Sequence, residues 1–148
     1  MGGVTMDGTE PVLVDDVDIV ELTEASGVRV RSGRRLGVAR VHATGHILGN
    51  HLYLVGGSSE GGTVQQTVLV SDLDEHGTNG PWRESVVLPA PRTHHAGIVH
   101  DGHIYLFGGL TTASAEVNEV WRSVNTPDGV ISGWETVGTM SEAPWTAS

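Results

Sequence analysis

The sequence predicts an all-β fold built from repeated four-stranded antiparallel sheets. The first observation behind this prediction is a repeat, because HLYLVGG at 51–57 and HIYLFGG at 103–109 are nearly the same heptapeptide, 52 residues apart. The second is the composition, since 21 of the 148 residues are glycine. That share is about twice the average and indicates many turns or crowded backbone positions.

The repeat extends well beyond the heptapeptide when the chain is shifted against itself by 52 residues. The matched positions include Arg40 with Arg92, His42 with His94, His51 with His103, Tyr53 with Tyr105 and Trp82 with Trp134. A period near 50 residues is typical of solenoids, propellers and repeat arrays. The chain is therefore best described as consecutive repeat units.

Within each unit the local signals are those of four strands. A hairpin is predicted around Gly49-Asn50, between the segments HATGHIL and HLYLVGG. A second hairpin is predicted around Asp101-Gly102, between HHAGIVH and HIYLFGG. A third strand is predicted in each unit, at TVQQTVLVSDL and at SAEVNEVWRSV. A fourth is predicted around Trp82 in one unit and around Trp134 in the next. Four antiparallel strands in a repeat of this length are typical of a propeller blade.

These residues resemble the kelch repeat, in a form similar to bacterial kelch-like proteins. The resemblance rests on an Arg before the first strand, a second strand that ends in Gly-Gly, and a Trp on the fourth strand. The Trp-Asp signature of the WD40 repeat is absent. We expect the glycine, tyrosine and tryptophan residues that recur in both units to be structural: Tyr53, Gly56, Gly57, Trp82, Tyr105, Gly108, Gly109 and Trp134.

The predicted blades leave the ring incomplete. Two complete blades are predicted, at residues 41–92 and 93–144. A partial blade with strands three and four is predicted at 1–40, and the start of a further blade at 145–148. In this interpretation Gly2-Gly3 ends a second strand, 11–22 (PVLVDDVDIVEL) is the third and 27–33 the fourth. A closed propeller needs four to eight blades. We therefore expect either a piece of a longer protein or self-association that completes a propeller.

Composition excludes several classes of function. The formal charge of −10 disfavours binding to nucleic acid or to an anionic membrane surface. The chain has no cysteine, and the histidines do not repeat as a ligand set, since Ile98 stands where His46 stands one unit earlier. We expect no metal, no cofactor and no catalytic group. The N-terminus lacks a signal-peptide pattern, but because the chain begins inside a repeat, localisation stays open between cytoplasmic and secreted.

Four residues are candidates for ligand binding because they lie nearest the expected central channel: Arg40, His42, Arg92 and His94. The kelch resemblance implies that arginines near the first strand face the central cavity and bind acidic partners. The alternative for these arginines is a hydrogen bond or ion pair between blades. The expected function is a binding or scaffold module that recognises a protein or glycan through one face. The alternative is part of a propeller enzyme acting on sugars, similar to sialic-acid mutarotases.

Overall fold

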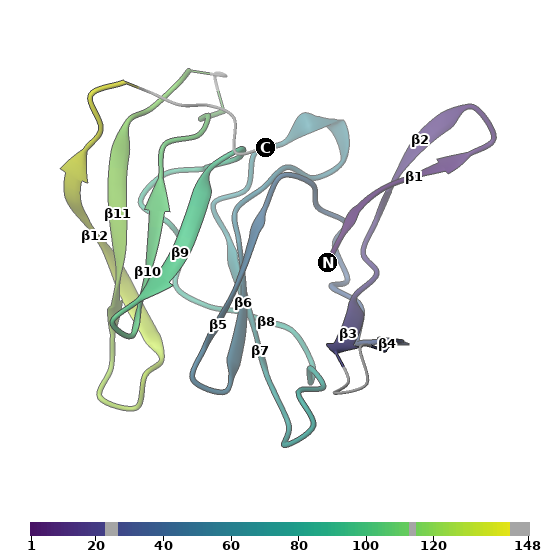
Figure 1. Cartoon of the computed structure of the whole chain (residues 1–148). Coiled ribbons are helices and arrows are strands. Elements are labelled where there is room, and N and C mark those ends of the chain that lie inside the picture. The colour runs from purple at the N-terminus through teal and green to yellow at the C-terminus, as the bar shows by residue number, and fades with distance from the viewer. Residues whose placement is uncertain (23–26, 113–114, 143–148) are drawn as a thin grey trace.

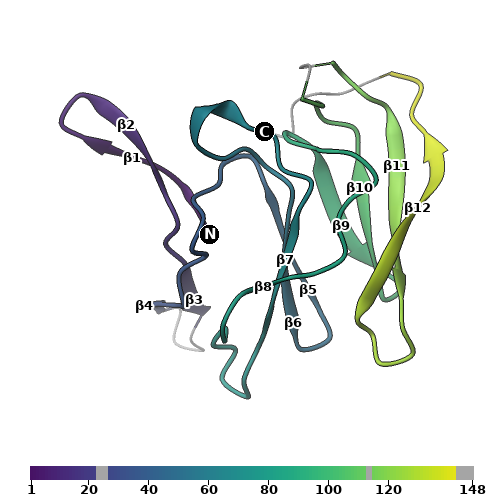
Figure 2. The same cartoon turned by 180° about the vertical axis from the view of Figure 1, so that it is seen from behind.

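The computed structural model describes residues 1–22, 27–112 and 115–142. Within these ranges the chain forms two two-stranded and two four-stranded sheets, and a 3-10 turn at Glu60–Gly62 is the only helical element described. The sheets stand side by side, and the hairpin of β1 (Gly3–Asp7) and β2 (Glu10–Val14) projects away from the rest of the molecule (Figures 1 and 2). The predicted all-β fold with four-stranded antiparallel sheets is confirmed.

Both four-stranded sheets follow the chain in simple order. The central sheet consists of β5 (Thr44–Leu48), β6 (His51–Val55), β7 (Val68–Asp72) and β8 (Arg83–Glu84). The C-terminal sheet consists of β9 (Ala96–His100), β10 (His103–Phe107), β11 (Glu119–Asn125) and β12 (Ile131–Thr139). Each strand pairs antiparallel with the next. This meander is the architecture expected of a propeller blade.

The two inner hairpins form as the sequence predicts. Leu48 pairs with His51 across the two-residue turn at Gly49-Asn50, where Gly49 has a φ of +62°. In the next unit Asp101 and Gly102 both have positive φ, at +46° and +72°. Positive φ at the first position, or at both, is what two-residue hairpin turns require, and this is why Gly, Asn and Asp occupy them.

The N-terminal region differs from the prediction. Residues 11–22 are not one strand, because β2 (Glu10–Val14) pairs with β1 (Gly3–Asp7), whereas β3 (Asp18–Leu22) pairs with β4 (Val28–Ser32). The break falls at Asp15-Asp16, whose carbonyls accept the amide hydrogens of Leu36 and Gly2 instead of continuing a ladder. The β3–β4 hairpin stands where strands three and four were predicted, and the β1–β2 hairpin is an element that the sequence analysis did not anticipate.

The repeat equivalences identify the β1–β2 hairpin as an enlarged loop between strands two and three. The amide of Gly2 bonds to Asp16, that of Gly56 to Thr67, and that of Gly108 to Glu119. The donor and acceptor residues of this hydrogen bond are thus 14 positions apart in the first unit and 11 positions apart in each of the other two. The three additional residues allow a regular five-pair ladder in the first unit.

Two hydrophobic cores lie between consecutive sheets. We call the side of a sheet that points toward the next sheet its forward face, and the opposite side its backward face. The larger core joins the forward face of the central sheet, including Tyr53 and Val70, to the backward face of the C-terminal sheet, including Leu106 and Trp121. The smaller core joins the β3–β4 region to the backward face of the central sheet through Val17, Leu36, Leu54 and Leu69, with Trp82 packed against them. Tyr53, Trp82, Trp121 and Trp134 thus serve packing between sheets, whereas Tyr105 lies on the other face of its sheet.

Strands β5 and β9 are neighbours, which brings the first strands of consecutive units together. The four candidate ligand residues precede these strands, so they lie at the same end of the two sheets. The exact blade boundaries stay a prediction. The predicted start of a further blade at 145–148 lies outside the described residues.

Candidate functional site

Arg40 and Arg92 are buried and make the same contacts one unit apart. Arg92 donates from Nη1 to the carbonyl of Gly108 at 2.8 Å, and Arg40 donates from Nη1 to the carbonyl of Gly56 at 3.2 Å. Their exposed fractions are only 1% and 4%. In turn, the carbonyl of Arg92 accepts the amide hydrogen of Gly57, the second glycine of the preceding pair. Each arginine thus connects two consecutive repeat units.

Further contacts hold each guanidinium in place. Arg92 forms an ion pair with Glu119 at 2.9 Å and lies 3.8 Å from the centre of the Trp121 ring. Arg40 instead bonds to the carbonyl and the hydroxyl of Thr67, at 3.1 and 2.6 Å. Burial lowers the pKa of both guanidinium groups, which nevertheless stay charged at neutral pH. These contacts favour the hydrogen-bonding alternative, and a role in ligand binding stays a prediction.

A buried polar chain crosses between the first strands of the two sheets. Thr44 Oγ1 lies 2.9 Å from His95 Nε2 and 3.0 Å from His46 Nε2. Burial lowers the pKa of His46 to about 4 and that of His95 to about 3. Both rings are therefore neutral at physiological pH, which fits a structural contact between sheets.

His42 and His94 form a stacked pair above this polar chain. Their ring centroids lie 3.8 Å apart and their planes are inclined by 25°. Both residues have a φ of +54°, and the amide of His94 donates to the carbonyl of His42 at 3.2 Å. Desolvation, followed by the neighbouring His42, lowers the pKa of His94. The repeated positive φ turns both rings to the same side, where they meet.

The stacked histidines border a groove between the β1–β2 hairpin and the loop at 58–62. We call it the hairpin groove. A cavity of about 400 Å³ lies beside His42 and His94, and its apolar walls include Val4, Leu13 and Val41. Hydroxyl-bearing Ser58 and Ser59 and the backbone at Gly62 line the opposite side.

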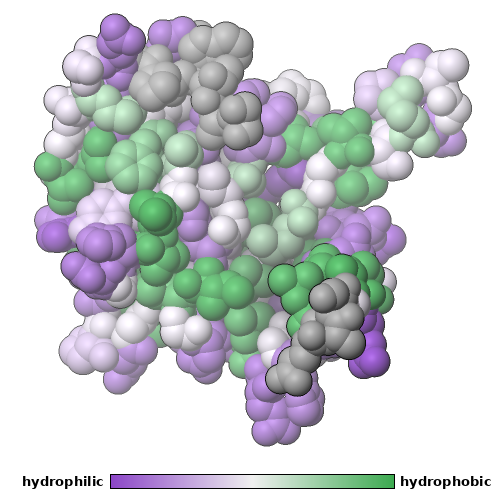
Figure 3. Space-filling view, in the orientation of Figure 1, coloured by the Kyte–Doolittle hydropathy of each residue, from purple (hydrophilic) through white to green (hydrophobic). Residues whose placement is uncertain are grey.

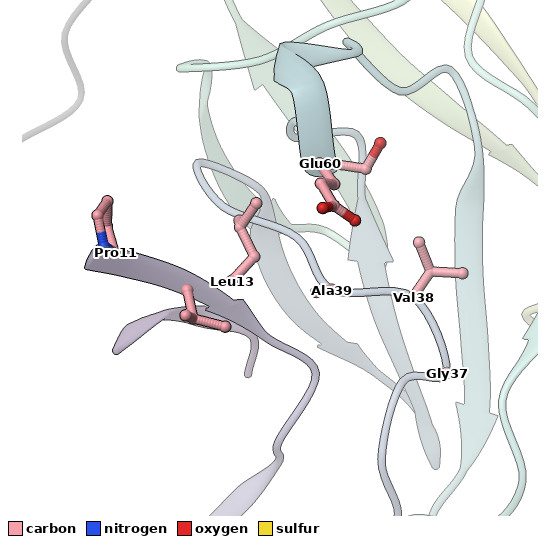
Figure 4. Close-up of a pocket in the computed structure, with 8 residues that line it drawn as sticks. Pro11, Leu13, Gly37, Val38, Ala39 and Glu60 are labelled. Carbon is pink, nitrogen blue, oxygen red and sulfur yellow. The ribbon is translucent and has the colours of Figure 1, made fainter. Parts of the chain in front are cut away.

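A second cavity of about 520 Å³ adjoins the first, and Figure 4 shows the residues that line it. It lies between the hairpin, the turn at Glu60–Gly62 and the segment at 37–39. Pro11, Leu13 and Ser59 line both cavities, and the carboxylate of Glu60 is the one charged group that lines this second cavity. The hairpin groove thus has mainly apolar walls beside the two histidines and a more polar part around Ser59 and Glu60.

The apolar wall of the hairpin groove follows from the register of the hairpin. Val4 pairs with Leu13 and Met6 pairs with Pro11, so these four side chains share one face of the ribbon. A sequence signal for this element exists, because Gly8 follows the alternating run at 4–7 and begins a two-residue turn before Glu10. Two of the four predicted ligand residues, His42 and His94, reach the hairpin groove, whereas Arg40 and Arg92 do not line either cavity.

Other kinds of site find no support among the described residues. In 1–22, 27–112 and 115–142 no three His, Asp or Glu side chains converge in a way that fits a metal ion. Over the same part of the chain, no helix has the length and apolar character needed to cross a membrane.

Comparison with known proteins agrees with a propeller-like arrangement. The structure described as "Structure of YjhT", which has a β-propeller-like fold, superimposes with a TM-score of 0.65 over 95% of this chain and 51% of that chain, at 14% sequence identity. At this identity the likeness shows the fold alone. The class of protein is therefore an all-β, propeller-like protein.

A curated relative is alpha-scruin of Limulus polyphemus, a kelch-repeat protein, which is 30% identical over 125 residues. The match covers 84% of this chain and 13% of alpha-scruin, so the chain spans about an eighth of that relative's length. A search against protein-family models gives no match.

Proposed function

We propose that the chain is a kelch-type binding module that holds an apolar segment of a protein partner in the hairpin groove. The observation that carries this proposal is the pair of adjoining cavities between the β1–β2 hairpin and the 58–62 loop. Binding sites are typically concave and mostly apolar, with a few polar groups that fix orientation. The walls at Val4, Leu13 and Val41 and the hydroxyls of Ser58 and Ser59 meet this description.

The charge near the hairpin groove favours a basic partner. Glu60 lines one cavity, and Asp7 and Glu10 lie at the exposed tip of the hairpin that forms the other wall. The whole chain carries a formal charge of −10. A segment with Leu or Val side chains flanked by Lys or Arg therefore complements both the apolar walls and the acidic surroundings.

The apolar part of the hairpin groove favours a peptide over a glycan. Glycans expose many hydroxyl groups, each of which loses hydrogen bonds to water when it is buried without a partner. The walls formed by Val4, Pro11 and Leu13 offer no side-chain hydrogen-bonding groups. No contact among the described residues favours the alternative of a sugar-active enzyme.

The test compares groove variants with a matched surface variant. Leu13→Asp places a charge on the shared wall of the two cavities, whereas Val87→Asp places the same charge at a site that is 49% exposed and outside the groove. Binding is measured first on arrays of fifteen-residue peptides and on glycan arrays, then by fluorescence anisotropy with the best peptide. We expect peptides that combine Leu or Val with Lys or Arg to bind, and Leu13→Asp to weaken binding at least about tenfold, equivalent to about 1.4 kcal/mol.

Two results would contradict the proposal. One is the absence of peptide binding, or peptide binding that Leu13→Asp and Val87→Asp leave equally unchanged. The other is binding on the glycan array alone with loss in Leu13→Asp, which would replace the protein partner by a carbohydrate.

A further inference from the structure

The forward face of the C-terminal sheet is open, whereas the corresponding face of the central sheet is buried inside the molecule. Tyr105 pairs with Ile98 and Arg122, so these three side chains share this face. Their counterparts one unit earlier are Tyr53, His46 and Val70, which are between 0% and 7% exposed because the C-terminal sheet covers them. Ile98, by contrast, is 55% exposed. The C-terminal sheet thus presents Ile98 and Tyr105 at its open side, at positions whose counterparts join the two sheets internally. Arg122, which pairs with Glu135, stands there in place of Val70.

The backward face of the β3–β4 hairpin is the matching open surface at the other side of the molecule. Val20 pairs with Val30 and Leu22 with Val28, which places four apolar side chains on this face. They are 57%, 60%, 83% and 64% exposed, respectively. The face is visible as a green region at the β3–β4 end of the molecule (Figure 3).

The repeat relates this surface to a known contact within the chain. Val30 lies 52 residues before Trp82, and Trp82 packs on the backward face of the central sheet against the core that includes Val17 and Leu36. The opposite side of the β3–β4 hairpin carries charged residues, among them Glu21 and Arg31, which form an ion pair at 3.0 Å. The apolar residues are therefore on the side that, in the later units, receives the preceding sheet.

We propose that these two faces bind one another between two copies of the chain. The forward face of the C-terminal sheet of one copy covers the backward face of the β3–β4 hairpin of another. This contact would repeat the internal one, since the two sheets of one chain already pack forward face against backward face. Exposed apolar surface on strands also associates readily when it is left uncovered.

Such a contact is head to tail, because each copy contributes a different surface. Contacts of this kind build rings when the rotation closes and open arrays when it does not. A variant blocked on either face can therefore no longer bind its own copies. Two variants blocked on different faces, however, still share one intact contact when they are mixed.

The experiment uses this property of the head-to-tail contact. Leu22→Asp blocks the hairpin face, Ile98→Asp blocks the sheet face, and Val87→Asp is the control on exposed surface outside both faces. Each protein is studied by size-exclusion chromatography with light scattering over a hundredfold range of concentration. The parent and Val87→Asp are expected to increase in mass with concentration, whereas each face variant alone stays at the chain mass of 15.6 kDa. An equimolar mixture of the two face variants is expected to give a complex of twice the chain mass.

Circular dichroism and thermal melting establish whether each variant is folded, and Val30→Asp is the second variant for the hairpin face. A parent protein that keeps the monomer mass at every concentration would overturn the proposal. So would face variants that fail to combine although the parent associates, because that result indicates a contact between identical surfaces. None of the substituted residues lines the hairpin groove, so this test and the peptide-binding test can fail independently.

Discussion

The hydroxyl of Tyr53 in the central sheet accepts the backbone amide hydrogen of Ile131 in the C-terminal sheet, at 3.3 Å. Tyr53 is fully buried, and the two residues are 78 positions apart. A buried amide that loses its partner carries a desolvation cost. This single hydrogen bond therefore contributes to the packing of one sheet on the next.

We expect Tyr53→Phe to lower the free energy of unfolding by about 1–2 kcal/mol, because the buried Ile131 amide loses this acceptor. Urea denaturation at a concentration where the chain is monomeric measures the change. Tyr105→Phe is the matched control, since Tyr105 occupies the equivalent position on the open forward face. Equal losses in both variants would show that the contact with Ile131 contributes nothing.

Arg92→Lys is expected to destabilise the protein by about 2–3 kcal/mol. A lysine has one cationic centre and cannot bond to Gly108, pair with Glu119 and cover the Trp121 ring together, as the guanidinium does. The control is Arg35→Lys, where the arginine side chain is 70% exposed and pairs with Asp16. Exposed ion pairs contribute little, so thermal or urea unfolding of Arg35→Lys should match the parent. A stable, parent-like Arg92→Lys would argue that the guanidinium is held for a ligand instead.

Gly57→Ala is expected to cost more than Gly77→Ala, although both glycines have positive φ, at +89° and +69°. A Cβ at Gly57 would lie 2.7 Å from the carbonyl oxygen of Val41 and from Cβ of Ala43, whereas a Cβ at Gly77 meets open space. The backbone conformation alone costs about 1 kcal/mol at either site. The excess measured for Gly57→Ala in chemical denaturation reports the close approach of the glycine pair to the segment at 41–43, which precedes β5 in the same unit. A similar loss at both sites would contradict this account.

Stability is expected to fall as the pH drops below about 6.5, in part because of His46. Burial lowers the pKa of His46 from 6.5 to about 4 in the folded protein. Between these values the unfolded chain binds a proton that the folded protein does not. The contribution is therefore fully present above pH 6.5 and is lost toward pH 4, with a slope of up to about 1.4 kcal/mol per pH unit.

His46→Gln removes this titrating group while keeping a side chain that can bond to Thr44. Free energies of unfolding measured by urea denaturation from pH 4 to pH 7 should show a shallower slope for this variant. His76→Gln, at a side chain that is 77% exposed, should keep the slope of the parent. An unchanged slope in His46→Gln would show that this histidine does not contribute to the acid sensitivity.

The parts of the fold that depend on local signals were predictable from the sequence. The hairpins around Gly49-Asn50 and Asp101-Gly102 combine alternating strands with turn residues that adopt positive φ, and both formed as expected. The prediction of one strand over 11–22 was wrong. Residues typical of strands lie on both sides of Asp15-Asp16, but the backbone leaves one sheet there and enters another. Composition alone does not reveal that change of partner.

The candidate site was only partly predictable. The repeat singled out His42 and His94, but their stacking joins residues 52 positions apart and arises only when the sheets pack. Arg40 and Arg92 were selected by the kelch resemblance, and their burial follows from contacts to glycine carbonyls that no sequence pattern displays. The hairpin groove was missed because the prediction ended one strand at Gly2-Gly3 and began the next at residue 11, so residues 4–10 were given no strand.

The loop between strands two and three has two lengths in one chain, yet the hydrogen bond that closes its base is the same from Gly2 to Asp16 as from Gly56 to Thr67. The glycine pair therefore separates the geometry of the sheet from the length of the loop above it. A longer loop at this point keeps the hydrogen bond that closes its base, as the β1–β2 hairpin shows. Within this architecture it is a natural position for grafting foreign recognition segments, and new specificities can evolve there while the sheets stay unchanged.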